Sequence, residues 1–326
     1  MGGPQGSLSF EVIELVEWYL FKPLGPVLFR WKGEYSPQYK GPRVLGLSEP
    51  FPLPSTIVGA LAALKIVSEG KDFANVRDPL DILGNNFNMW GPLLYLGKGK
   101  IGVHRYPGSI VILNDEAICR DGKFAIKEDN LKNPLELGMI QGRVGVKLDI
   151  TGKAAIEGYL YEAAMFDIKK LQRELNKEEQ NTSDVGYAIN VNVNLNLKTP
   201  ALIRFGGEGR LALVKKMDGS DLEKFVPKIG EQGLFMLASP ALLSAEIFKS
   251  LESEMQPKVG DFEIAECKHS AHLGYINTGY DMAKNMRRPT YPALMSGSLL
   301  RGKATGTHLD PSGKHHSWGS LVRVIG

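Results

Sequence analysis

The sequence predicts an α+β fold made of two units, each with an antiparallel sheet. The chain has 326 residues, which is long for a single small module and leaves room for a large core. Strand-like and helix-like segments follow as strand, loop, helix and strands, and the second half returns to strands, a helix and a strand. With 43% hydrophobic and 23% charged residues, the composition is typical of a globular protein and not of a disordered one.

The first half begins with a strand, a long loop and a helix. Residues 8–21 alternate loosely and are rich in β-branched and aromatic side chains, which predicts a strand. Residues 23–54 are so rich in proline that a long surface loop is expected in place of a helix or a central strand. A helix is predicted over 55–69, with Ser55 as its N-cap and Gly70 as its end.

The rest of the first half is predicted to be extended. Residues 93–114 predict one or two short strands around a Gly/Lys turn, and residues 154–167 predict another extended segment. An acidic, polar stretch follows, and we expect a linker there. We therefore predict an N-terminal domain over residues 1–180 and a C-terminal domain over residues 181–326.

The second half repeats strand and helix signals. Apolar residues alternate with asparagines over 189–197, which predicts a strand with one buried face and one polar, uncharged face. Residues 210–216 and 234–237 predict short strands, and residues 239–251 predict a helix that opens at a Ser-Pro pair.

Charge and cysteine content limit the function classes. The formal charge of +3 is small, so any nucleic-acid footprint must come from local sorting of charge along the chain. Cys119 and Cys267 lack metal-ligand spacing, so we expect no disulfide framework and a reducing cytoplasm. No apolar run reaches about 18 residues, and residues 1–7 lack the pattern of a signal peptide, so neither a membrane span nor secretion is expected.

A glycine-rich segment over 204–210 is the first candidate binding site. Its glycines permit a close backbone approach, consecutive amides can point at a phosphate, and an arginine stands at each end. A tight hairpin turn with incidental arginines is the plain alternative. Residues 207–212 also match the dinucleotide-binding fingerprint, but the short strand predicted at 210–216 leaves no room for the helix which that fingerprint requires.

Three further segments carry basic or phosphate-binding signals. Residues 284–303 interleave basic side chains with aromatics and glycines and contain no acidic residue, although a solvated surface run would look the same. The start of the helix at Ser55 and Thr56, with Arg43 nearby, could hold a phosphate or could simply be capped. Residues 143–149 form either a binding loop or a strand with exposed cations, and composition does not decide between these.

Catalytic and metal-binding patterns are not found in the sequence. The six histidines lack carboxylates or cysteines at ligand spacing, and no nucleophile elbow, P-loop or His-Glu-x-x-His motif occurs. We therefore expect no metal, no cofactor and no catalytic residue in this chain.

Five segments, taken in order, are similar to motifs of one protein family. They are residues 23–30, 51–61, 143–161, 205–210 and 274–299. In the second of them, Pro54-Ser55-Thr56 and Gly59-Ala60 resemble the Pro-Ser-Thr-x-x-Gly-Ala helix start of that family. The turn over 205–210 resembles its Gly-Gly-Glu-Gly-Arg motif.

The family is the third subunit of the Cmr complex, the type III-B CRISPR effector, within the RAMP superfamily. The resemblance covers the chain from about Leu8 to Arg301. It implies two ferredoxin-like (RRM-like) domains with long loop insertions, and binding of the 5′ repeat-derived tag of the guide RNA (crRNA). It also implies contact with the large polymerase-like subunit and with the first backbone subunit, an indirect relation to target RNA, and no nuclease activity.

These expectations leave a specific set of candidate residues and two rival functions. The residues expected to bind RNA are Arg43, Ser55, Thr56, Arg143, Lys147, Arg204, Gly206, Gly207, Gly209, Arg210, Lys284, Arg287, Arg288, Gly297, Ser298 and Arg301. One rival is a guide-RNA-processing endoribonuclease of the same superfamily, which is disfavoured because no histidine precedes His104. The other is a nucleotide-dependent oxidoreductase, which is disfavoured because no helix is predicted after Gly209.

Overall fold

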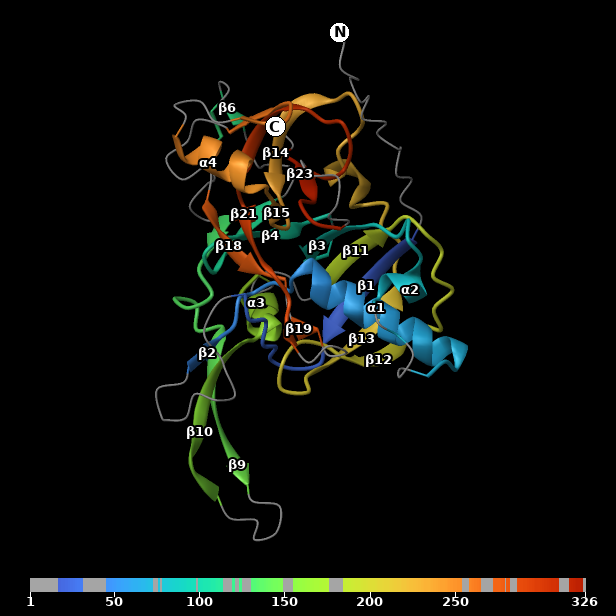
Figure 1. Ribbon diagram of the computed structural model, residues 1–326, viewed down its shortest axis with the longest axis vertical. Helices are drawn as coiled ribbons and strands as arrows, with labels where there is room; N and C mark the ends of the chain where they lie inside the picture. The colour runs from blue at the N-terminus through green and yellow to red at the C-terminus, as the bar shows by residue number, and fades with distance from the viewer. Residues whose placement is uncertain are drawn as a thin grey trace.

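The computed structural model has an α+β architecture with many strands and few helices (Figure 1). It describes residues 17–31, 45–72, 76, 78–97, 99–113, 119–120, 123–124, 130–148, 155–175, 184–253, 258–264, 272–278, 280–281, 286–310 and 317–324. The helical elements are α1 (Pro54–Glu69), α2 (Leu80–Leu83), α3 (Ile168–Leu175), the 3₁₀ turn η3 (Glu223–Phe225) and α4 (Ala245–Ser253).

The strands fall into two groups along the chain. The first group is β1 (Glu17–Pro23), β2 (Leu45–Leu47), β3 (Met89–Tyr95), β4 (Ile101–Arg105), β5 (Ser109–Leu113), β6 (Cys119–Arg120), β7 (Lys123–Phe124), β8 (Leu131–Lys132), β9 (Ile140–Leu148), β10 (Ala155–Phe166), β11 (Gly186–Val191), β12 (Ala201–Arg204) and β13 (Leu211–Lys216). The second is β14 (Gln232–Leu237), β15 (Ala241–Leu242), β16 (Lys258–Val259), β17 (Phe262–Ile264), β18 (Leu273–Asn277), β19 (Tyr280–Asp281), β20 (Met286–Arg287), β21 (Thr290–Leu294), β22 (Leu299–Lys303) and β23 (Leu321–Arg323).

An eight-stranded antiparallel sheet forms the centre of the molecule. Its strand order is β12-β13-β1-β11-β3-β4-β5-β8. A five-stranded sheet of order β16-β17-β22-β14-β23 and a three-stranded sheet of order β15-β21-β18 come from the C-terminal part. The hairpin β9–β10, with β2 paired in parallel to β10, projects away from this body (Figure 1).

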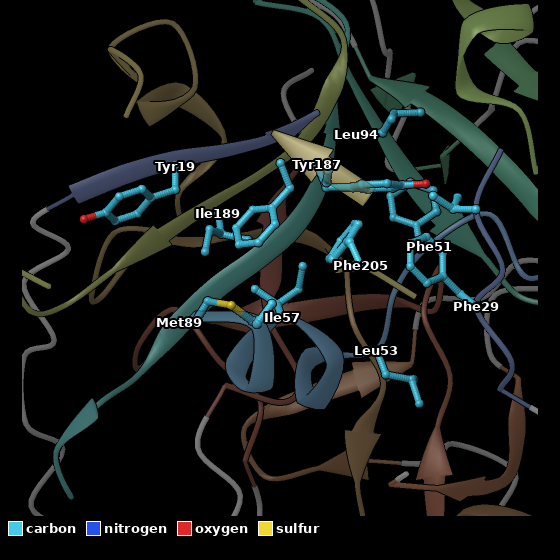
Figure 2. Packing of buried hydrophobic residues seen from close by; sticks show 14 of the residues in the cluster. Tyr19, Phe29, Phe51, Leu53, Ile57, Met89, Leu94, Tyr187, Ile189 and Phe205 are labelled. Carbon is cyan, nitrogen blue, oxygen red and sulfur yellow. The ribbon is translucent and has the colours of Figure 1, made fainter. Parts of the chain in front are cut away.

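Helix α1 covers the inner face of the central sheet. Ile57 and Leu61 on α1 are fully buried, and they belong to the same core cluster as Phe21 and Tyr187 from the sheet. Figure 2 shows Ile57 and Tyr187 among the residues of this cluster. The Tyr187 hydroxyl donates a 2.6 Å hydrogen bond to the Pro50 carbonyl just before the helix. The alternating strand pattern therefore places Phe21 and Tyr187 under α1.

The outer face of the same sheet is covered by the C-terminal part. Trp18 and Trp90 meet edge to face with ring centroids 5.6 Å apart, in a second cluster that also contains Met236 and Val322. The Trp90 indole N–H donates a 2.7 Å hydrogen bond to the Leu321 carbonyl of β23. Because both faces of β3 are covered, six of its seven residues are buried. Its sequence is therefore apolar throughout and does not alternate apolar with polar residues.

Serine hydroxyls join β3 to the C-terminal part of the chain. Ser317 accepts a 2.9 Å hydrogen bond from the Met89 amide, and the Ser320 hydroxyl both accepts from the Gly91 amide at 3.1 Å and donates to the Gly91 carbonyl at 2.9 Å. Such satisfied, buried polar contacts fix the register between two packed layers.

A buried turn at Gly297 and Ser298 forms another part of this junction. Gly297 has φ +84°, its amide donates to the Leu237 carbonyl at 2.7 Å, and an added Cβ would lie 2.6 Å from Arg105 Cα. The buried Ser298 hydroxyl donates to the Met295 carbonyl at 2.7 Å. The prediction that Gly297 and Ser298 contact RNA does not fit this burial, because protein already surrounds both residues.

The proline-rich segment is not a surface loop where it is described. Val27 exchanges two backbone hydrogen bonds with Phe166, at 2.8 and 2.9 Å, and Phe29 bridges to Glu49. Val27, Phe29 and Phe51 are buried. The prolines limit this segment to the short strand β2 and isolated bridges, and the apolar residues between them supply core contacts.

The asparagine-rich strand was predicted too long and with the wrong exposure. β11 ends at Val191, and all six of its residues are buried, including Asn190. Asn192 leaves the sheet, where its side chain accepts from the Asn88 amide and donates to the Asn86 carbonyl, both at 2.7 Å. Asparagine side chains compete for backbone groups in this way and so end strands.

The helix predicted from Ser239 starts later. Residues 241–242 form β15, which pairs with β21, and α4 begins at Ala245. The Ser244 hydroxyl accepts a hydrogen bond from the Ile247 amide at 3.3 Å, which is the geometry of an N-cap. Of the helices in the part of the chain that is described, none is long and apolar enough to cross a membrane.

Glu17 gives a prediction about acid stability. Its nearly buried carboxylate accepts hydrogen bonds from the Tyr19 hydroxyl and the Lys216 ammonium, both at 2.5 Å, and from the Leu195 amide at 3.2 Å. Burial raises the pKa of Glu17, but these donors outweigh it and leave the pKa below its ordinary value of 4.5. The stabilisation is thus fully present above about pH 4.5 and is lost as pH falls through the folded-state pKa.

Glu17→Gln should lower the free energy of unfolding at about pH 7 by about 1–3 kcal/mol, because it removes charge-assisted hydrogen bonds. The difference from wild type should shrink as the pH falls below about 4.5, measured by urea unfolding across the range. Glu263→Gln is the matched control, since its 2.8 Å pair with Lys258 is exposed and should contribute little. A difference that does not change with pH would contradict this origin.

Gly297 gives a prediction about the junction. Gly297→Ala should lower the free energy of unfolding by about 2–4 kcal/mol, because the new Cβ meets the Arg105 backbone in a left-handed conformation. Gly25→Ala is the control, since a Cβ there meets nothing within 4 Å. A Gly297→Ala protein with wild-type stability and weakened RNA binding would instead support direct RNA contact at this turn.

Candidate nucleic-acid interface

The glycine-rich turn over 205–210 joins β12 to β13 and is held by a buried aromatic ring. Phe205 lies with its ring centroid 5.2 Å from that of Phe29 (Figure 2), and 5.2 Å from that of Phe21. Its amide donates a 2.7 Å hydrogen bond to the Arg210 carbonyl, which closes the hairpin. β13 starts at Leu211, so a strand follows the glycines and the dinucleotide-binding fingerprint is not formed.

Two of the three glycines approach the protein's own backbone. Gly206 has φ +84°, and a Cβ there would lie 3.0 Å from the Leu28 carbonyl oxygen. The Gly207 amide donates to that same carbonyl at 2.9 Å. Gly209 differs, because it has φ +63° and a Cβ there would meet nothing within 4 Å. The turn is therefore fixed on its Leu28 side and open at Gly209.

The two arginines of the turn lie on opposite sides of the sheet. Arg204 is exposed at the end of β12. Arg210 faces Phe205 across the hairpin, and side chains directly opposite each other share a face, so Arg210 lies on the α1 side. Its Nε is enclosed and has no hydrogen-bond acceptor among the described residues. An enclosed guanidinium N–H without an acceptor is costly, and an anionic oxygen would satisfy it.

The start of α1 belongs to the same aromatic cluster. Leu53 is the N-cap, with no side-chain capping bond, and Pro54 occupies the first turn, so the prediction of Ser55 as N-cap was wrong. Ser55 and Thr56 are half-buried in the first turn, and the Thr56 amide bonds to the Leu53 carbonyl at 2.9 Å. No acidic residue lies in that turn, so nothing there repels an anion.

The other predicted contacts are dispersed. Arg143 is exposed on β9 of the projecting hairpin, and Arg301 is exposed on β22 beside Glu263 of β17. Arg288 is half-buried, and its carbonyl accepts a 2.9 Å hydrogen bond from the Asn277 side chain. The structure therefore does not gather these arginines with the glycine-rich turn.

Some predicted contacts lie outside the described residues. They are Arg43 and Lys284, together with the side chains of Lys147 and Arg287.

Sequence reasoning missed a buried Ser–His–Glu arrangement. His104 Nδ1 lies 2.6 Å from the Ser296 hydroxyl, and its Nε2 lies 3.1 Å from a Glu49 carboxylate oxygen that also accepts from the Gly108 amide at 3.1 Å. The Trp31 ring covers the imidazole at a centroid distance of 4.3 Å. His104 and Ser296 have no exposed surface, so a substrate cannot reach the hydroxyl in this conformation and the three groups hold segments together. These residues lie 55 and 192 positions apart, which leaves no motif in the sequence.

No group of three or more His, Cys, Asp or Glu side chains that could hold a metal ion occurs within the described ranges.

Comparison with known proteins places the chain in a family. The sequence model of a family described as CRISPR-associated protein (Cas_Cmr3) matches residues 122–312, more than half of the chain. A relative from Saccharolobus solfataricus, the CRISPR system CMR subunit Cmr3, is 26% identical over 298 residues, which cover 86% of this chain and 85% of the relative.

Solved structures share the fold. A chain of the type III-B Cmr-beta bound to cognate target RNA and AMPPnP has a TM-score of 0.58 and 20% identity, covering 87% of this chain and 86% of its own length. A chain of the type III-B Cmr-beta bound to cognate target RNA has a TM-score of 0.56 at the same identity and coverage. With a family model that spans most of the elements described above, from β7 to beyond β22, the chain belongs to the Cas_Cmr3 family of CRISPR-associated proteins.

Proposed function

We propose that this chain is a non-catalytic, RNA-binding subunit of a type III-B CRISPR effector complex, and that it acts in the cytoplasm. In this proposal it binds the 5′ repeat-derived tag of the guide RNA and joins the large polymerase-like subunit to the backbone of the complex. Family membership and the RNA-bound complexes that contain its structural relatives support this role. The observation that carries RNA binding is the half-buried Arg210, which forms no ion pair within the described residues, beside the open side of the turn at Gly209.

We propose that the fold consists of two ferredoxin-like units. In the first, α1 connects β1 to β3 and the strand order is β13-β1-β11-β3; in the second, α4 lies between β14 and β17 and the order is β23-β14-β22-β17. Both orders match the βαββαβ pattern, although among the described residues no helix lies where its second helix would be. In this arrangement the division lies between β13 and β14, since a division at 180/181 would separate β11 and β13 from β1, to which both are hydrogen-bonded.

RNA would bind at turns and not on a sheet face. RRM domains stack bases on an open sheet, but here α1 covers one face of the central strands and the C-terminal part covers the other. The open side of the glycine-rich turn at Gly209 and the half-buried Arg210 beside it suit phosphates better than bases. Affinity for the tag should then fall as the salt concentration rises.

The rival endoribonuclease would need an accessible acid or base. His104 is enclosed by protein, and His308 is bonded to the Met89 carbonyl through Nε2 at 2.8 Å. Neither position favours proton transfer to an RNA strand. This argues against His104 and His308 as the acid or base of such an enzyme.

The proposal is tested by the binding of guide RNA with and without its 5′ tag, at two salt concentrations, with the RNA examined for cleavage. The wild-type chain should prefer the tagged RNA and leave it intact. Arg210→Ala should weaken binding about tenfold or more, since a charge-assisted contact contributes about 1.5–3 kcal/mol. It should not lower the melting temperature, because it removes a group that lacks an acceptor in the free protein.

Arg301→Ala is the matched control, because Arg301 is an exposed arginine on another sheet. Equal losses in the two variants would mean that only overall charge matters. Cleavage of the RNA that persists through purification and depends on a histidine would favour the processing enzyme.

A further inference from the structure

Several exposed leucines lie near the edge of the central sheet. Leu24, Leu202 and Leu211 are 47%, 57% and 39% exposed. They come from three places in the sequence, after β1, in β12 and at the start of β13. Single exposed leucines are ordinary, but a contiguous group marks an interaction surface.

Strand register puts these leucines on one face. Leu202 pairs with Leu213, and Leu211 pairs with Arg204. The Leu24 amide bonds to the Leu211 carbonyl at 3.0 Å, one step beyond the pairing of β1 with β13. Directly opposed residues share a face, so Leu24, Leu202, Leu211 and Leu213 form one surface, which we call the leucine patch.

The leucine patch lies on the outer side of the sheet, away from α1. Ala212 and Val214, the neighbours of Leu211 and Leu213 along β13, point the other way into the core under α1. Farther along β1 the outer face is covered by the C-terminal part, where Leu20 is buried. The leucine patch is thus a section of that face which the described residues leave uncovered.

The edge strand beside the leucine patch has free hydrogen-bonding groups. β12 ends the eight-stranded sheet, and no other described strand pairs with its outer side (Figure 1). The Phe205 amide bonds to the Arg210 carbonyl, and bonded pairs alternate along an antiparallel ladder. Ile203 therefore bonds to β13, whereas the N–H and C=O groups of Leu202 and Arg204 point away from the sheet.

The charge next to the leucine patch is positive and available. Arg204 is exposed and forms no ion pair within the described part of the chain. Lys22, on the same face, is already held by Asp184 at 2.9 Å, and Lys215 also binds Asp184. One guanidinium is therefore free to meet a carboxylate from outside.

We propose that a partner protein of the complex docks here by adding an extended segment to β12, with apolar side chains on the leucine patch and a carboxylate on Arg204. An open strand edge next to an apolar face is the geometry of strand addition. In that mode main-chain hydrogen bonds give the affinity for the added strand, and pockets for its side chains give the specificity. RNA is a poor occupant, because four leucines offer nothing to phosphates. The inference rests on the bridging role proposed above. It assigns Arg204 to a contact with protein and not to a contact with RNA.

The test uses the full chain co-expressed with the large subunit or with the backbone subunit of the complex from the same organism. Leu202→Lys should reduce retention of one of these subunits at least tenfold, and Arg204→Glu should reduce retention of the same subunit. Leu135→Lys is the matched control, because Leu135 is 71% exposed but lies in the turn before β9. Binding of tagged RNA by the Leu202→Lys chain alone should equal that of wild type.

Amide hydrogen exchange tests the strand addition directly. Partner binding should slow exchange at Leu202 and Arg204 and leave Ile203, already bonded to β13, little changed. Unaltered assembly in both variants, loss of RNA binding in Leu202→Lys, or a self-association of wild type that Leu202→Lys abolishes would each overturn the proposal. If wild type shows no tag preference while Leu202→Lys still breaks assembly, the RNA role fails and the docking surface stands.

Discussion

The hydrogen bond from the Trp90 indole to the Leu321 carbonyl crosses the layer between the central sheet and the C-terminal sheet. A buried indole N–H needs an acceptor, and this one is supplied by a strand 231 residues farther along the chain. The same strand β3 is bonded at its start to Ser317 and Ser320. Once β3 is fixed in this way, the C-terminal part must lie on the outer face of the central sheet and α1 on the inner face.

That enclosure limits where the protein can bind anything. A sheet that is covered on both faces offers ligands only its ends, its edges and the turns between its strands. The glycine-rich turn is at one such place, and its conformation is set from inside by Phe205 and Leu28. Rigid support under an open turn is what holds a binding group in a fixed position.

The sequence predicts the strands and turns of this fold better than it predicts their surroundings. The strand at 211–216 and the long extended segment at 155–166 follow from local patterns. The end of β11 does not, because Asn192 binds the backbone of residues about a hundred positions away. Ser55 is not the N-cap for a local reason. Pro54, which has no backbone N–H, starts the first turn of the helix, so the N-cap is Leu53.

In the candidate site, too, the local sequence predicts some features, whereas residues far apart in the sequence determine others. The glycine pattern predicts close backbone approach at 206 and 207, and the structure has it, but the group approached is Leu28, which only the tertiary fold places there. Gly297 and Ser298 resemble a binding turn in sequence and are enclosed for the same kind of reason. The Glu49–His104–Ser296 contacts and the leucine patch each join residues from separate segments, so neither leaves a pattern along the chain.

The hairpin at 204–210 places two arginines with different surroundings only six positions apart in the sequence. Successive side chains of a strand point to opposite faces, so Arg204 lies with Leu202 and Leu211 on the outer side, and Arg210 lies with Phe205 on the α1 side. The outer arginine adjoins an apolar surface with a free strand edge, whereas the inner one adjoins an open glycine and has an enclosed N–H to satisfy. Two arginines that look equivalent in the sequence are therefore suited to different partners, a protein strand on one side of the sheet and a phosphate on the other.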